Sequence, residues 1–261
     1  MDVSKLLPRW LIRRTAGPIG QVVSFPKSGR TWLRVLLDDL GLPLTYTHAD
    51  SGHRHGRHFS QLPSPSSAEQ PTVLLIRNPL DTLVSGYFQA TVRLRIFDSS
   101  IADFCRNPHH GIEKIVHFNL MWLRAANSEP RIMVVTYEGM KSHLMLQLQR
   151  IHQHLAKPVP DPARLQLSIH RASFERMQQN EAKGKYAKRY AAALSPRDRD
   201  DRETFKVRRG VVGGYVDYLS QTDIAHCEAV LNRYQYHTVM NSLLGDSPSG
   251  EDYHAIARRA A

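Results

Sequence analysis

The chain has 261 residues, of which 41% are hydrophobic, and this length suits one large α/β domain or two small ones. No apolar run approaches the roughly eighteen residues that a membrane span needs, and the basic N-terminal stretch is too weakly apolar to predict a secretory signal. The net charge of +11 favours a polyanionic partner, either a nucleic acid, an anionic membrane surface or a highly phosphorylated small molecule.

The first half of the chain alternates short apolar runs with amphipathic ones. Residues 22–25 predict a strand, residues 31–40 predict a helix that stops at Gly41, and residues 44–47 predict a short second strand. Residues 48–67 are rich in His, Gly, Pro and Ser and predict a loop. The run TVLLI at residues 72–76 is typical of a parallel strand covered on both faces. Pro79 then begins a predicted helix that extends to residue 92.

The second half continues the alternation and defines the fold class. Residues 99–106 and 111–126 predict helices, residues 131–135 a buried strand, and residues 140–155 a further helix. Strands that alternate with helices predict an α/β three-layer sandwich with a central parallel sheet. Ligands of such sheets bind beyond the carboxyl ends of the strands. We therefore expect the segments that follow residues 25 and 76 to lie on the same rim.

The organisation of the chain is that of a single domain covering residues 1–261, with a core at about residues 20–245. Residues 180–204 are charged and poor in large apolar side chains, which predicts a mobile lid or a solvated linker. The C-terminal tail is expected to be frayed. Cys105 and Cys227 show no metal-ligand spacing, so we expect free buried thiols in a reducing compartment and a cytoplasmic location.

The segment FPKSGRTW, residues 25–32, has the layout of a P-loop-like phosphate-binding loop between a strand and a helix. Backbone N–H groups at a helix N-terminus face the ligand there, and the helix dipole favours an anion. Glycine lets the backbone approach the ligand closely. An ordinary strand-turn-helix connection with a surface lysine is the alternative. The residues that would bind phosphate or flank it are Lys27, Ser28, Gly29, Arg30, Thr31 and Trp32.

The loop does not match a nucleoside triphosphatase. In that class the lysine follows a glycine, and a later strand ends in an Asp that holds Mg²⁺. Here no glycine precedes Lys27, and the strand at residues 72–76 is followed by Arg77 and Asn78. This pattern predicts a site built on cations of the protein, with no metal. An arginine at a strand end suggests a second phosphate, to which Ser85 would add a hydroxyl.

A third segment, FKVRRGVVGGYVDYLS at residues 205–220, combines two arginines with nearby glycines. Backbone and side chains of this kind jointly wrap anions. Alone, the segment would be an ordinary basic turn. Its candidate anion-binding residues are Arg208, Arg209 and Gly210.

Together these segments resemble the sulfotransferase family that uses 3′-phosphoadenosine 5′-phosphosulfate (PAPS). FPKSGRTW is similar to the family's 5′-phosphosulfate loop, RNPLDTLVS to its 3′-phosphate motif, and RRGVVGGYVDYLS to its Arg-Lys-Gly segment. TYEGM and SFERMQQN are weaker matches in the family's order. The resemblance implies a PAPS-dependent transferase that needs no metal.

The resemblance also implies individual roles. Lys27 would neutralise the donor oxygen that becomes anionic as the sulfuryl group leaves. The rest of the loop would hold the 5′-phosphate and adenine. The 3′-phosphate would be held by Arg77, Ser85, Arg208, Arg209 and Gly210, and adenine would contact Tyr137 and Phe174. Arg30 departs from the family's usual Thr, so the role of its side chain is open.

The general base is expected in the loop after residue 47. The resemblance places a His after Lys-Thr at this point, and YTHAD supplies His48, although Tyr46 departs from the Lys. An imidazole suits proton abstraction near neutral pH. His48 is therefore the candidate base. His53, His55, His58 and Asp50 are alternatives.

The prediction is a sulfotransferase that transfers a sulfuryl group from PAPS to an unidentified hydroxyl or amine. The acceptor is a small molecule, a saccharide or a lipid rather than a nucleic acid. The alternatives are a P-loop kinase or nucleotide hydrolase, which would depend on Mg²⁺, and a basic nucleic-acid-binding protein, whose affinity would fall with salt. The oligomeric state cannot be read from the sequence.

Overall fold

The computed structural model describes residues 17–65, 69–190, 194 and 204–245. Its sheet is parallel throughout, in the order β2-β1-β3-β4. The strands are β1 (Gln21–Val23), β2 (Thr45–Thr47), β3 (Thr72–Ile76) and β4 (Ile132–Thr136). The parallel sheet confirms the predicted fold class, although β1 ends two residues before the predicted strand does.

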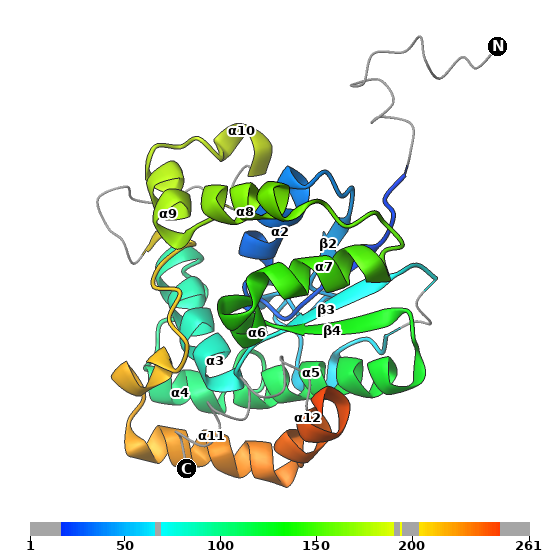
Figure 1. Ribbon diagram of the computed structural model, residues 1–261. Coiled ribbons are helices and arrows are strands. Elements are labelled where there is room, and N and C mark those ends of the chain that lie inside the picture. The colour runs from blue at the N-terminus through cyan, green and yellow to red at the C-terminus, as the bar shows by residue number, and fades with distance from the viewer. Residues whose placement is uncertain (1–16, 66–68, 191–193, 195–203, 246–261) are drawn as a thin grey trace, which may run out of the picture.

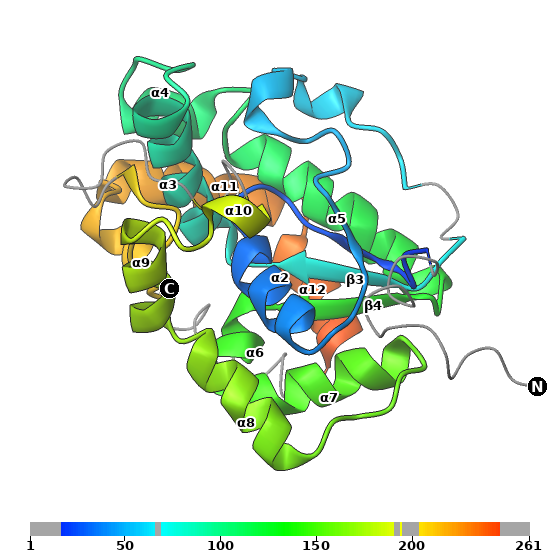
Figure 2. The ribbon, with the colours of Figure 1, turned by 90° about the horizontal axis from the view of Figure 1, so that it is seen from above.

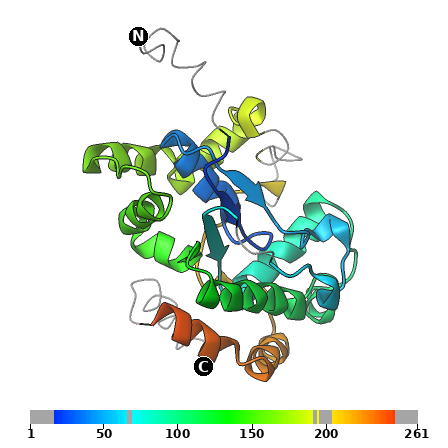
Figure 3. The ribbon, with the colours of Figure 1, turned by 90° about the vertical axis from the view of Figure 1, so that its right-hand side faces the viewer.

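Helices cover both faces of this sheet, so the domain has three layers (Figures 1 and 3). Side chains of β3 alternate between the two faces: Leu74 and Ile76 belong to one buried apolar cluster, and Val73 and Leu75 to the other. The first cluster packs against α3 (Pro79–Phe88), α5 (Ile112–Ser128), α11 (Gln221–Arg233) and α12 (Tyr236–Leu244). The second packs against α2 (Arg30–Asp39), α7 (Leu144–His154) and α8 (Pro162–Arg171). A strand buried on both faces needs the continuous apolar run that the sequence shows.

Two of the predicted helices are interrupted or change type in the structure. The predicted helix 140–155 is wrong as a single element, because α6 (Tyr137–Ser142) and α7 are separated at His143, whose φ of −132° and ψ of 46° are not helical. The end of the helix predicted to reach residue 92 is a π-helical turn, Gln89–Arg93, that follows α3. The predicted loop 48–67 contains two short 3₁₀ turns, His53–His55 and Phe59–Gln61.

The remaining elements include part of the predicted lid. They are α4 (Ile101–Arg106), α9 (Phe174–Ala182), α10 (Ala187–Tyr190) and the 3₁₀ turn Gly214–Asp217. Residues 180–190 therefore end one helix and contain another, whereas residues 191–193 and 195–203 of the predicted lid and residues 246–261 of the predicted tail lie outside the described residues. No described helix is long and apolar enough to cross a bilayer, and Cys105 and Cys227 are free and buried.

The order of the strands defines one crevice. The chain runs from β1 outward to β2, and then crosses to β3 on the other side of β1. Such a reversal leaves a crevice at the carboxyl ends of the two central strands, where ligands of open α/β sheets bind. Figure 2 shows α3, α9 and α10 on the side toward which β3 points. The loops after β1 and β3 both open into this crevice.

Candidate active site

A cavity of about 220 Å³ lies at the carboxyl ends of β1 and β3. It brings together all but one of the predicted site residues, although they come from six separate segments of the chain. The exception is Ser28, which is buried beneath the loop and does not line the cavity. The predicted residues that line it are Lys27, Gly29, Arg30, Thr31, Trp32, His48, Arg77, Ser85, Tyr137, Phe174, Arg208, Arg209 and Gly210.

The loop after β1 is shaped by two left-handed residues. Gly29 precedes α2 with a φ of 96°, and a Cβ added there would lie 2.6 Å from Cδ2 of Tyr137. Only glycine accommodates both this backbone and this contact. Lys27 adopts a φ of 73°. This left-handed backbone conformation costs energy for any residue that has a Cβ atom. The loop thus presents the open N-terminus of α2, whose first N–H groups have no intrahelical acceptor.

Several cationic side chains lie near the Lys27 side chain. Its Nζ donates to Oε1 of Gln89 at 3.4 Å. Burial lowers the pKa of Lys27 well below its ordinary value, and the positive charges of Lys206, Arg93 and Arg208 lower it further. An anion bound in the cavity would raise the pKa of Lys27 again, because its negative charge would stabilise the ammonium form.

Arg77 directly follows β3 and lines the same cavity. Its guanidinium donates to the backbone oxygens of Lys27 at 3.4 Å and Val211 at 2.9 Å. The same group lies 4.5 Å from the ring centre of Tyr137. Its Nε atom is buried without a hydrogen-bond partner among the described residues. Arg77 also pairs with Asp81 at 3.7 Å, so it joins three chain segments while one of its donors is used by no described residue.

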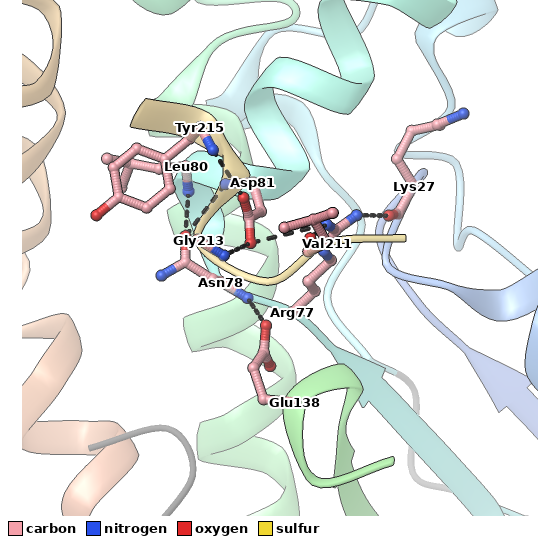
Figure 4. A network of polar contacts seen from close by, with 9 residues as sticks. All are labelled: Lys27, Arg77, Asn78, Leu80, Asp81, Glu138, Val211, Gly213 and Tyr215. Atoms are coloured by element: carbon pink, nitrogen blue, oxygen red, sulfur yellow. Dashed lines mark hydrogen bonds and ion pairs between the residues drawn. The ribbon is translucent and has the colours of Figure 1, made fainter. Parts of the chain in front are cut away.

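Asn78 and Asp81, which follow Arg77, hold the backbone around the cavity in place (Figure 4). Asn78 caps α3, because its side chain accepts hydrogen bonds from the N–H groups of Leu80 and Asp81. Asp81 is 4% exposed and accepts from the N–H groups of Gly213 at 2.8 Å and Tyr215 at 3.1 Å. These bonds fasten the loop that follows Gly210 to the start of α3.

Glu138 also holds this backbone in place. Its Oε1 accepts from the backbone N–H of Asn78 at 3.0 Å. Burial raises the pKa of Glu138 to about 7, against the opposing effect of that hydrogen bond and of Arg77. Its other carboxyl oxygen has no partner among the described residues. The weak TYEGM match thus marks a residue that positions the Arg77 turn.

The third predicted segment provides two arginines with different partners. Arg208 donates to the hydroxyl of Tyr218 at 2.7 Å and lies 4.1 Å from the ring centre of Phe88. Arg209 is exposed and forms an ion pair with Asp217 at 2.6 Å. Gly210 has a φ of 65°, and a Cβ added there would lie 2.8 Å from the ring of Phe174.

Aromatic rings line the same cavity. Trp32 and Tyr137 meet edge to face, with their centres 5.7 Å apart, and Nε1 of Trp32 donates to the backbone oxygen of Ala172 at 3.0 Å. Phe174 lines the cavity beside Gly210. Ser85, on α3, presents a hydroxyl for which no described residue is a partner. Flat faces beside several cations suit a planar base that carries phosphate groups.

His48 directly follows β2 and is held at both ring nitrogens. Nδ1 lies 2.8 Å from the backbone oxygen of Ser24, and Nε2 lies 2.8 Å from Nη2 of Arg30. A carbonyl only accepts and a guanidinium only donates, so the partners assign the proton to Nδ1 and a lone pair to Nε2. Burial lowers the pKa of His48 to about 3, and the charge of Arg30 contributes to this shift. The ring is therefore neutral, with its basic nitrogen turned toward Arg30.

The alternative bases do not line the first cavity. Asp50 is exposed and pairs with Arg57 at 3.2 Å, and His58 caps the turn at Phe59–Gln61. His53 and His55 line a second, adjoining cavity but not the first. Among these candidates, only His48 lines both cavities.

Lys206 is the functional candidate that the sequence reasoning missed. It is half-buried, lines both cavities, and its pKa is lowered to about 8 by burial and by Arg93 and Arg30. The one available signal was its place two residues before Arg208 in a segment already singled out.

The chain matches one protein-family model over most of its length. A family model described as "Sulfotransferase domain" matches residues 58–241. The match includes Arg77, Tyr137, Phe174 and Arg208 but begins after the Lys27 loop. No curated protein sequence matches the chain.

The solved structures agree in fold. Mouse sulfotransferase SULT7A1 complexed with PAP is 19% identical, with a TM-score of 0.62, and the match covers 92% of this chain and 88% of that one. Retinol dehydratase in complex with androsterone and the inactive cofactor PAP is 16% identical, with a TM-score of 0.62, and the match covers 88% of this chain and 82% of that one. At these identities the similarity shows that the chain shares their fold.

Proposed function

Because the chain belongs to the sulfotransferase-domain family, whose model matches residues 58–241, we propose that it is a single-domain enzyme that uses PAPS as the donor. It would transfer the sulfuryl group to a hydroxyl or amine of a small molecule, saccharide or lipid. One observation carries this proposal. The first cavity joins the Lys27 loop, Arg77 and the segment at Arg208 around aromatic rings, and this is a set of groups suited to two phosphate groups and a base.

The residues present fit such a donor. The Nε of Arg77 is a buried donor without a described partner. The hydrogens of Gly29 and Gly210 face Tyr137 and Phe174, where a Cβ would have no room. We assign the 5′-phosphosulfate to the Lys27 loop and the 3′-phosphate to Arg77, Ser85 and the segment at residues 208–210. Tyr137, Phe174 and Trp32 would contact adenine.

Bound PAPS supplies an activated sulfuryl group, and its leaving oxygen gains negative charge as the sulfur–oxygen bond breaks. Lys27 would neutralise that oxygen, because its ammonium group lies in the loop among groups that favour an anion. His48 would take the proton of the acceptor at Nε2 once Arg30 releases that nitrogen. Positioning and charge stabilisation of this kind supply most of the catalysis in group transfers between oxygens.

The test is calorimetric binding of adenosine 3′,5′-bisphosphate (PAP) in the absence of metal, compared with ATP in the presence and absence of Mg²⁺. The proposal expects PAP to bind at least about tenfold more tightly than ATP, because only PAP carries the 3′-phosphate that Arg77 would hold. A preference for Mg-ATP would refute the donor assignment and indicate phosphoryl chemistry.

A further inference from the structure

A second cavity, of about 390 Å³, adjoins the first. The two cavities share Lys27, Arg30, His48 and Lys206. A molecule in the second cavity would therefore contact the candidate base and the candidate catalytic lysine, while a donor fills the first. The loop after His48 and the π-helical turn that contains Gln89 provide the outer walls.

The second cavity is cationic. Lys27, Arg30, Arg54 and Lys206 line it. Asp50 is the one carboxylate among its described lining residues, and it is exposed and paired with Arg57 at 3.2 Å. Neutral or cationic molecules would gain nothing from this excess of positive charge, whereas an anion would.

Arg30 and Lys206 form no ion pair with a carboxylate of the described residues. Nη2 of Arg30 contacts the neutral ring of His48, and its Nη1 is buried without a hydrogen-bond partner among the described residues. Burial lowers the pKa of Arg30 to about 10, as expected for a cation without a counter-charge.

Lys206 is similar. The structure gives its Nζ no hydrogen bond or ion pair with a described residue. The nearby carboxylate of Glu181 is already engaged by the backbone N–H groups of Lys206 and Val207 and by Arg93 at 3.6 Å. Glu181 is the carboxylate whose charge favours the ammonium form of Lys206, and Arg93 shares it. An anionic ligand would add counter-charge to a site in which cations outnumber carboxylates.

Building on the proposed sulfotransferase function, we propose that the second cavity binds the acceptor and selects molecules that carry an anionic group, a carboxylate, sulfate or phosphate ester, near the reacting hydroxyl. Arg30 and Lys206 hold that group. A guanidinium binds an anion more strongly than a neutral imidazole. The acceptor therefore draws Arg30 from Nε2 of His48, and this frees the nitrogen that accepts the hydroxyl proton.

The experiment uses pairs of probes that differ only in charge: 4-hydroxyphenylacetate and its methyl ester, and glucuronic acid and its methyl ester. Binding to the full chain is measured by calorimetry with and without PAP. We expect the acid of at least one pair to bind about tenfold more tightly than its ester. Comparing the phenol pair with the sugar pair shows whether the cavity prefers an aromatic or a saccharide acceptor.

Three variants assign the effect to its residues. The first two variants are Arg30→Thr and Lys206→Met. Thr is the residue that the sulfotransferase family usually has at the position of Arg30. Each variant should reduce the preference for the acid to about threefold or less. Lys157→Met is the matched control, because it removes the same charge from an exposed residue outside both cavities. It should leave the preference intact. Thermal unfolding of each variant shows whether a lost preference is only a lost fold.

The outcomes separate the two proposals. If no pair favours the acid, or if the preference survives both substitutions, the anionic acceptor site is refuted, whether or not PAP binds. If the acid is preferred but PAP does not bind, the proposed donor is refuted and the anion site stands.

Discussion

Asp81→Asn tests whether the motif after Arg77 builds the donor site by tethering the segment of residues 210–215. The Asp81 carboxylate is 4% exposed and accepts from Gly213 at 2.8 Å and Tyr215 at 3.1 Å. Asn has a similar shape but a single acceptor oxygen, so one backbone N–H would face the N–H₂ group. Losing one charge-assisted bond and burying one unpaired N–H should lower the free energy of unfolding by about 2–4 kcal/mol.

The assay combines urea denaturation with calorimetry of PAP. Because the tether positions Gly210 and Val211 beside Arg77, the affinity for PAP should fall by about tenfold or more. The matched control is Asp161→Asn at the N-cap of α8, where the side chain accepts from the N–H of Arg164 at 2.9 Å. Asn caps helices as well as Asp does, so this change should cost no more than a few tenths of a kcal/mol.

Two results would refute the reasoning. If Asp81→Asn is no less stable than Asp161→Asn, the two bonds to Gly213 and Tyr215 contribute nothing to the fold. If stability falls but the affinity for PAP does not, the tethered segment is not part of the donor site.

Three further predictions follow from the same geometry. Lys27→Ala should slow sulfuryl transfer from PAPS to whichever acid probe binds more tightly by at least about 100-fold, and it should not lower the unfolding midpoint, because it removes a cation that burial and neighbouring cations disfavour; turnover at the original rate would contradict its role. Arg77→Ala should weaken PAP by about 100-fold in calorimetry and weaken adenosine 5′-phosphosulfate, which lacks the 3′-phosphate, far less; equal losses would remove Arg77 from the 3′-phosphate site. The pKa of His48 is lowered to about 3, so the unfolded chain binds a proton near pH 6.5 that the folded chain does not, and stability is lost as the pH falls from 6.5 toward 3. His48→Gln should reduce that loss in urea unfolding at pH 7 and 5, and an unchanged pH dependence would count against the buried neutral ring.

The sheet and the donor side of the site were predictable from local patterns. A run such as residues 72–76 is apolar at every position because both of its faces are buried. The carboxyl ends of parallel strands share a rim, so the Lys27 loop and Arg77 had to meet once β1 and β3 were neighbours. Ser28 is the one predicted binding residue that does not line the cavity, because its side chain is buried in the interior next to the turn at Gly29.

The contacts of Arg30 and Lys206 around the second cavity could not be predicted, because they join distant segments of the chain. The bond between Arg30 and His48 joins residues 18 positions apart, and it depends on how β2 lies beside β1. Lys206 lines both cavities, but its segment was singled out for its arginines and glycines and not for this lysine. The break at His143 was missed for a similar reason, since apolar spacing continues across it and only the backbone angles interrupt the helix.

The tether between Asp81 and Gly213 spans 132 positions of the chain, and this has a consequence for synthesis. A chain growing from its N-terminus makes the Lys27 loop and Arg77 early, but it cannot close the donor cavity until the segment up to residue 215 has emerged. A product truncated before that point keeps the loop and lacks the far wall. PAP should therefore stabilise only chains that extend past residue 215, since a ligand stabilises the state that binds it. Tight binding would then distinguish chains that extend past residue 215 from those that stop before it.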